Sequence, residues 1–367
     1  MKNPLIEKWA KALVGYSVEV RPGQNVVIMG QTAAEDLLVA CAKEVIAAGA
    51  HPIIWPQVEG VAPYLLTHGS DEQLQWLSPF ETYARTEADV MINIRAETNT
   101  RRMNEVDPTR QRLYTSARNE LSATYMQRAA DGELDWTLTL YPTDAYAQDA
   151  DMDTAAFTDF CMKAMKLDQD DPVAAWQELH DDQQRLIDWL DGKSEIRLTS
   201  PDTDLTVNVA GRTWVNSDGR RNFPSGEIFT GPVETSANGH IRFSFPVVTG
   251  GRRIEDIRLK FEDGKVVDAT ASKNEEYLIT TLDTDAGARY LGEFAFGTNF
   301  GIQTFIGNIL FDEKIGGTVH MALGRGYPET GSHNVSAIHW DMICDLREGG
   351  EITVDGELFQ KDGTFVI

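Results

Sequence analysis

Hydrophobic positions in the first part of the chain alternate between short apolar runs and stretches with helical spacing. Val26 to Met29 is an apolar run, and Ala33 to Ala48 carries its apolar residues at the spacing of one helix face. Gly49 is placed to end that helix, and His51 to Trp55 has the composition of a strand. This order predicts a strand, a helix and a second strand.

The same alternation continues toward residue 141. We expect a helix at Asp71 to Leu77, a strand at Ala88 to Ile94, one long helix at Thr109 to Ala130 and a strand at Trp136 to Tyr141. Strands that alternate with helices are typical of a mostly parallel sheet with helices on its faces. The first part of the chain is therefore predicted to be an α/β domain.

The pattern changes after two further helical stretches between Ala155 and Asp191. Beyond them, alternating strands and turns predominate, and Asp263-Gly264 between two such runs predicts a hairpin. Helices are expected only at Glu275 to Thr281 and at Asp283 to Tyr290. This second part is predicted to be mainly β.

The length of 367 residues exceeds one ordinary hydrophobic core, so we expect two domains. Gly192-Lys193-Ser194 interrupts the last long helical pattern, and we place the boundary there. The prediction is an N-terminal parallel-sheet α/β domain at 1–192 and a β-rich catalytic domain at 193–367.

Charge and composition exclude several partners. Lys plus Arg number 33 against 57 Asp plus Glu, a net charge of −24, which repels nucleic acid and anionic lipid. Gly30 lacks the glycine spacing of a nucleotide-binding loop, so no such cofactor is predicted. Three scattered cysteines, no stretch as long as a membrane span and no apolar signal core lead us to expect a cytoplasmic protein.

The most specific chemical signal is His339-Trp340-Asp341. Residues two apart on a strand point to the same side, so His339 and Asp341 would share one face while Trp340 and Met342 pack on the other. An imidazole and a carboxylate on one face can reach the same cation. This segment therefore predicts a metal site.

Four further candidate ligands precede it. Glu227 begins an apolar strand after a glycine, and Glu293 is the only charge in an apolar run, where an unpaired carboxylate is costly to bury. His320 lies within an apolar strand, and Glu313 is expected to be its hairpin neighbour across a Gly-Gly turn. Each has a structural alternative: Arg289 could pair with Glu293, and Asp312-Glu313-Lys314 could be a surface loop with a local ion pair.

Two histidines and four acids exceed the needs of one ion and suit two hydrolytic metals bridged by carboxylates. Tyr327 lies between the two histidines on a glycine-rich loop. Its phenol could donate a hydrogen bond to the oxyanion of a tetrahedral intermediate, or it could simply cap the loop. His333 has polar turn neighbours and is expected to be exposed.

These residues resemble those of the aminopeptidase T family, the thermophilic-type dinuclear metalloaminopeptidases. The similarity spans essentially the whole chain and is most specific from Ser225 to Asp345. The matching stretches are Gly226 to Thr230, Tyr290 to Glu293, Leu310 to Glu313, His320 to Gly324 and His339 to Asp341.

The resemblance implies a homodimer that removes N-terminal residues from peptides with a free N-terminus, using two divalent ions such as Co, Zn, Mg or Mn. It implies Tyr327 as the active-site tyrosine and six metal-site residues: Glu227, Glu293, Glu313, His320, His339 and Asp341. The chain has Asp312-Glu313-Lys314 where the family usually has Asp-Glu-Asn, and an extra Gly-Gly before His320. Glu313 therefore stays open between metal ligand and general base.

The expected mechanism has two cations that share Glu293 and activate a water for attack on the first peptide bond. The alternative is a mononuclear Fe(II) ring-cleaving dioxygenase with His320, His339 and Asp341 as its ligands. Glu227 and Glu293 favour the hydrolase, since a single iron has no use for the extra carboxylates. A catalytically silent binding protein would hold no metal, which elemental analysis would reveal.

Overall fold

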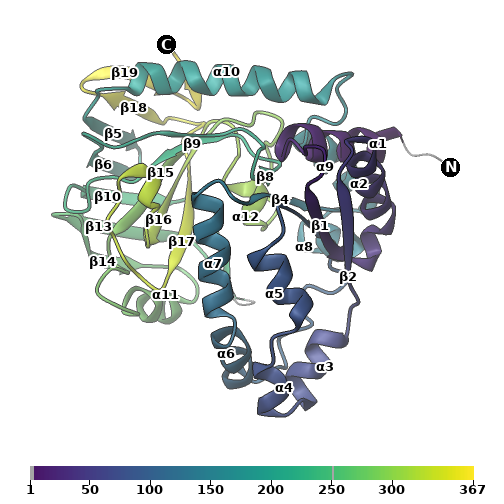
Figure 1. Ribbon diagram of the computed structural model, residues 1–367. Helices are drawn as coiled ribbons and strands as arrows, with labels where there is room; N and C mark the ends of the chain where they lie inside the picture. Colours follow the sequence, from purple (N-terminus) through teal and green to yellow (C-terminus); the bar gives the residue numbers. More distant parts are fainter. Residues whose placement is uncertain (1–3, 250–251) are drawn as a thin grey trace. The chain divides into compact units, whose positions relative to one another are not determined.

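The computed structural model describes residues 4–249 and 252–367, which form two compact units (Figure 1). One unit contains the chain up to Val173 together with Gly219–Phe223, and the other contains Ala174–Asp218 and Pro224–Ile367. The chain passes from the first unit to the second after Val173, and the short segment Gly219–Phe223 belongs again to the first unit. The domain boundary near residue 192 stays a prediction.

The first unit is built on a parallel sheet with the strand order β2-β1-β3-β4-β8. Its central strands read as nearly continuous apolar runs because both of their faces are buried. The sheet confirms the predicted α/β class. The strands are β1 (Asn25–Gln31), β2 (His51–Gln57), β3 (Val90–Arg95), β4 (Asp135–Leu140) and β8 (Asn222–Phe223).

Helices connect these strands, as parallel pairing requires. They are α1 (Pro4–Lys11), the π-helix η1 (Ala12–Ser17), the 3-10 helix η2 (Thr32–Ala34), α2 (Glu35–Ala47), α3 (Val61–His68), α4 (Asp71–Gln75), α5 (Pro79–Thr86), α6 (Pro108–Ser116), α7 (Asn119–Ala130), α8 (Asp144–Asp149) and α9 (Thr154–Ala164). No helix in the described part of the chain combines the length and apolar character that a membrane span needs.

The prediction of one long helix at Thr109 to Ala130 is wrong, because α6 ends at Ser116 and α7 begins at Asn119. Arg118 lies at the break. Its guanidinium donates to the carbonyl of Tyr114 at the end of α6, to the carbonyl of the distant Leu74, and pairs with the distant Glu81 at 2.9 Å. The contacts with Leu74 and Glu81 cross about 40 residues of sequence, so helical periodicity alone could not reveal them.

The second unit consists mainly of antiparallel sheets, which confirms its predicted β-rich character. One sheet has the order β14-β13-β10-β6-β5-β18-β19-β20, a second has the order β17-β16-β15-β9-β7, and β11 pairs with β12. The predicted hairpin at Asp263-Gly264 joins β13 to β14. The strands are β5 (Glu195–Ser200), β6 (Thr203–Asn208), β7 (Val215–Ser217), β9 (Glu227–Thr230), β10 (Asn238–Phe243), β11 (Val247–Thr249), β12 (Arg252–Ile254), β13 (Ile257–Glu262), β14 (Lys265–Thr270), β15 (Leu291–Gly297), β16 (Thr318–Gly324), β17 (His339–Asp345), β18 (Glu351–Val354), β19 (Glu357–Lys361) and β20 (Thr364–Phe365).

The helical elements that complete the chain are α10 (Pro172–Leu190), α11 (Glu275–Leu282), α12 (Ile309–Asp312) and the 3-10 helix η3 (Pro328–Thr330). The helix predicted at Glu275 to Thr281 is confirmed as α11. The helix predicted at Asp283 to Tyr290 is wrong, because this segment forms turns. The carboxylate of Asp285 accepts bonds from the backbone N–H groups of Gly287, two residues later, and of the distant Ala337. A local side-chain bond such as the one to Gly287 competes with helix formation.

One hydrophobic core takes side chains from both large sheets of the second unit. Phe294, Phe296, Met321, Trp340 and Met342 supply it from β15, β16 and β17. Because side chains alternate along a strand, the intervening residues of these strands point to the opposite face of their sheet. That face carries the candidate site.

Phe296 offers a direct test of this core. It is fully buried, and its ring packs on Trp214 and Phe359 with centroid distances of 5.7 and 5.1 Å. We expect Phe296→Ala to lower the free energy of unfolding by about 3–5 kcal/mol in a urea titration. The matched control Phe300→Ala, at a side chain 55% exposed, should change it by less than about 0.5 kcal/mol. Equal small effects would contradict this packing.

Candidate metal centre

Adjacent strands bring the predicted ligands together on one face of the sheet β17-β16-β15-β9-β7. Glu293 of β15 pairs in register with Ala322 of β16, which pairs with Asp341 of β17. His320 lies two residues before Ala322 and His339 two before Asp341, so all four ligand candidates share this face. The predicted alternation of ligands with Trp340 and Met342 is present in β17.

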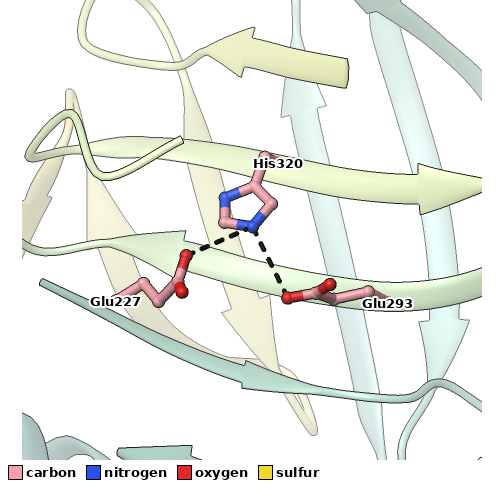
Figure 2. Close-up of side chains that lie close together, drawn as sticks. All are labelled: Glu227, Glu293 and His320. Carbon is pink, nitrogen blue, oxygen red and sulfur yellow. Dashed lines mark ion pairs between the residues drawn. The ribbon is translucent and has the colours of Figure 1, made fainter. Parts of the chain in front are cut away.

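Glu293 lies between the two histidines. Its Oε1 is 3.6 Å from His320 Nε2, and its Oε2 is 3.1 Å from His339 Nε2. His320 Nε2 also lies 3.4 Å from Glu227 Oε2, so the imidazole contacts acids from β9 and β15 (Figure 2). The alternative partner Arg289 pairs instead with Asp283 at 2.8 Å. Glu293 thus has the two histidines as partners.

His339 is oriented by a backbone contact. Its Nδ1 lies 2.7 Å from the carbonyl oxygen of Arg325, which can only accept, so Nδ1 carries a proton. Nε2 therefore faces the acids and lies 3.5 Å from Asp341 Oδ1. The hydroxyl of Tyr327 is also 3.5 Å from this nitrogen, which places the phenol at the same centre. Such a backbone bond is a common support for a metal-binding histidine.

Gly226 places Glu227 at the start of β9. Its φ is +115°, a left-handed conformation that favours glycine, and a Cβ there would come within 2.6 Å of Asn299 Cβ. Glu227 itself is only 5% exposed. Its Oε1 accepts a bond of 2.6 Å from Lys314 Nζ, while its Oε2 faces His320.

Glu313 is not a hairpin neighbour of His320, contrary to the sequence prediction. It follows α12 directly and caps its C-terminal end, and its carboxylate forms an ion pair with Lys314. The surface-loop alternative is also wrong, because Asp312 and Lys314 are each only 1% exposed. The Gly316-Gly317 pair predicted a hairpin turn. Glu313 instead reaches the centre from the C-terminal end of the short helix α12.

Lys314 is the residue of this site that sequence reasoning missed. Its ammonium is buried between Glu227 and Glu313. Burial would lower the pKa of Lys314, but these two acids raise it, so the ammonium stays charged. The sequence signal was its departure from the family's usual Asp-Glu-Asn, which drew attention to Glu313 rather than to Lys314 itself.

The pKa values of the cluster reflect strong coupling among its groups. Burial opposes charge on the histidines. Contacts with Glu293 and Glu227 nevertheless raise the pKa of His320 to about 9, and contacts with Asp341 and Glu293 raise that of His339 to about 11. Burial would raise the pKa of Glu293, but the two histidines lower it to about 2. Burial, opposed by Lys314, raises the pKa of Glu313 to about 7. Without a metal, protons neutralise part of the negative charge here.

The donor set fits a divalent cation. Glu227 Oε2 and Asp341 Oδ1 are buried and have no hydrogen-bond partner among the described residues. Unpartnered buried carboxylate oxygens are costly, and they are a ligand type that divalent metals accept. Ligand atoms lie within 4.8 Å of one another in three groups: Glu227, Glu293 and His320; Glu293, His339 and Asp341; and Glu313, His320 and Asp341.

All six predicted metal-site residues and Tyr327 therefore meet at one centre, whereas His333 is exposed as expected. A cavity of about 180 Å³ adjoins this centre. Apolar side chains form much of its wall, and His339, Asp341 and Asp312 also border it. The centre thus combines a dense set of donors with an adjoining space for a bound molecule.

Comparison with known proteins identifies the family. The model of the thermophilic metalloproteases (M29) matches residues 2–365. Aminopeptidase 2 of Geobacillus stearothermophilus is 30% identical to this chain, and the match covers 96% of this chain and 95% of the relative. Aminopeptidase T of Thermus aquaticus is 34% identical, and that match covers 56% of this chain and 55% of the relative. The structure of wild-type AmpT from Thermus thermophilus shares the fold, with a TM-score of 0.85 and 21% identity over 99% of each chain. The chain belongs to the family of thermophilic metalloproteases (M29).

Proposed function

We propose that this chain is a metal-dependent aminopeptidase, which releases N-terminal amino acids from peptides with a free N-terminus. Membership in a metalloprotease family and relatives named aminopeptidases support the activity. The observation that carries the proposal is the buried Glu293 carboxylate between His320 and His339. These matches lend no support to the dioxygenase alternative, and a single iron would leave Glu227 without a role.

We propose two cation positions that share Glu293. One is formed by Glu293, His339 and Asp341 (the His339 position), and the other by Glu227, Glu293 and His320 (the His320 position). Co, Zn, Mg and Mn are the candidate ions, since mixed nitrogen and oxygen ligands accept several divalent metals. A bound divalent cation supplies Lewis acidity, which makes water more acidic and polarises a carbonyl group.

The protein's own groups supply the remaining chemistry. Tyr327 remains protonated, because burial and the surrounding acids raise its pKa, and it can donate a hydrogen bond to the oxyanion that forms at the scissile carbonyl. Glu313 can accept a proton from the attacking water and deliver it to the leaving amine, since its pKa is close to neutrality. We therefore propose Glu313 as the general acid–base residue, a role that its place beside His320 and Asp341 also allows.

We propose that the adjoining cavity receives the side chain of the first substrate residue. Val247, Val248, Phe305 and Ile343 line it, so an apolar side chain fits its wall. The positively charged α-amino group of the substrate would be attracted by the acids that border the same space. The preferred substrates are therefore peptides that begin with an apolar residue.

We further propose that the protein acts as a homodimer in the cytoplasm. The resemblance of its site motifs to those of the aminopeptidase T family supports the dimer. The free thiols of Cys41, Cys161 and Cys344 are all buried, which is compatible with a reducing compartment.

Metal removal and loss of His339 test the activity. Because both disrupt the centre that holds the cation, dialysis against a chelator and His339→Ala should each lower kcat/KM for a leucyl chromogenic amide by at least about 100-fold. Added Mn²⁺ or Co²⁺ should restore the chelated wild type. The matched control His333→Ala alters an exposed imidazole and should retain full activity. Retention of hydrolysis after either treatment would refute the proposal.

The cavity is tested by a charge placed in its wall. Val248 lines the cavity and is 45% exposed, whereas Val335 is 83% exposed and is not among the lining residues. Val248→Lys should lower kcat/KM for the leucyl amide by about tenfold or more and affect the glycyl amide less, since glycine has no side chain to place there. Val335→Lys should leave both values unchanged. An equal loss for both amides would show that the cavity does not hold the side chain.

A further inference from the structure

A buried ammonium lies inside the candidate metal centre. Lys314 is 1% exposed, and its Nζ is 2.6 Å from Glu227 Oε1 and closer still to a carboxylate oxygen of Glu313. Two carboxylates in direct contact with the ammonium favour its charged form, and its field acts there at short range. Any cation that binds nearby must share the acids with it.

Lys314 affects the two proposed cation positions unequally. It holds one oxygen of Glu227, a member of the His320 position, so only Oε2 remains for a metal there. It also holds Glu313, which is grouped with His320 and Asp341. The His339 position, made by Glu293, His339 and Asp341, includes neither of the acids that Lys314 contacts.

Burial reinforces this difference. The side chains of Glu227 and His320 are 6% and 1% exposed, whereas those of His339 and Asp341 are each 15% exposed, and these two residues border the adjoining cavity. Repulsion between like charges is screened least where water is excluded. The ammonium therefore opposes a cation most strongly at the His320 position.

The net charge of the cluster also favours one tightly bound cation over two. Ionised Glu227, Glu293, Glu313 and Asp341 would carry four negative charges, and Lys314 offsets one of them. A first divalent cation is still bound by an excess of negative charge. A second would leave the buried cluster with an excess of positive charge, which is costly to bury.

We propose that Lys314 makes the two cation positions unequal: the His339 position binds a divalent ion tightly, and the His320 position binds one weakly. This inference rests on the two-cation centre of the proposed function. Lys314 is a positioning residue here, acting as a built-in cation beside Glu227. Occupancy of the second position then follows the supply of free metal, while the first position stays filled.

The test is a titration of the metal-free full-length protein with Mn²⁺, with free Mn²⁺ followed by electron paramagnetic resonance. The wild type should bind one ion at least about tenfold more tightly than a second. Lys314→Gln removes the charge and should tighten the second step by about tenfold or more, whereas the control Lys314→Arg keeps the charge and should preserve the gap. Two equal steps in the wild type, or an unchanged gap in Lys314→Gln, would overturn the inference.

Circular dichroism would show whether Lys314→Gln folds. If it does not, two variants that retain Lys314 still test which position binds the first ion. His339→Ala should abolish the tight step, and His320→Ala should abolish only the weak one. The opposite assignment would overturn the inference. Two Mn²⁺-binding steps of equal affinity, with metal-dependent hydrolysis intact, would refute only the unequal positions. A chain that binds no Mn²⁺ and hydrolyses the substrate without metal would refute both the proposed function and this inference.

Discussion

The candidate metal centre depends on a carboxylate, Glu293, that is buried between two imidazoles on the polar face of a largely buried sheet. An acid buried in its ionised form requires positive charge close by. In the metal-free chain, protonated His320 and His339 provide it. A divalent cation can take over that role when the protons leave, because metal-binding imidazoles are neutral. The same constraint explains why acids and histidines gather here.

The fold meets this constraint through strand register. The core-facing residues of β15, β16 and β17 are large and apolar, and they fix the strands so that the alternating polar residues line up across the sheet. Gly226 permits the tight backbone approach that places Glu227 at the edge of this row. The hydrophobic core and the candidate metal centre thus lie on the two faces of a single sheet.

Much of this could be predicted from the sequence, because period-two alternation encodes which residues share a strand face. His339 and Asp341 were separable from Trp340 and Met342 on that basis, and the hairpin at Asp263-Gly264 followed from its turn residues. Features decided by distant contacts were not predictable from local pattern. Arg118, at the break between α6 and α7, contacts Leu74 and Glu81 far along the chain, and folding buries Lys314 against the distant Glu227.

The most direct measurement is a crystal structure of the Mn²⁺-loaded protein with anomalous scattering data collected at the manganese edge. We expect the strongest anomalous peak at about 2.0–2.6 Å from oxygen atoms of Glu293 and Asp341 and from Nε2 of His339. A map with no peak there, or one in which Glu293 turns away from both histidines, would contradict the central role of this carboxylate.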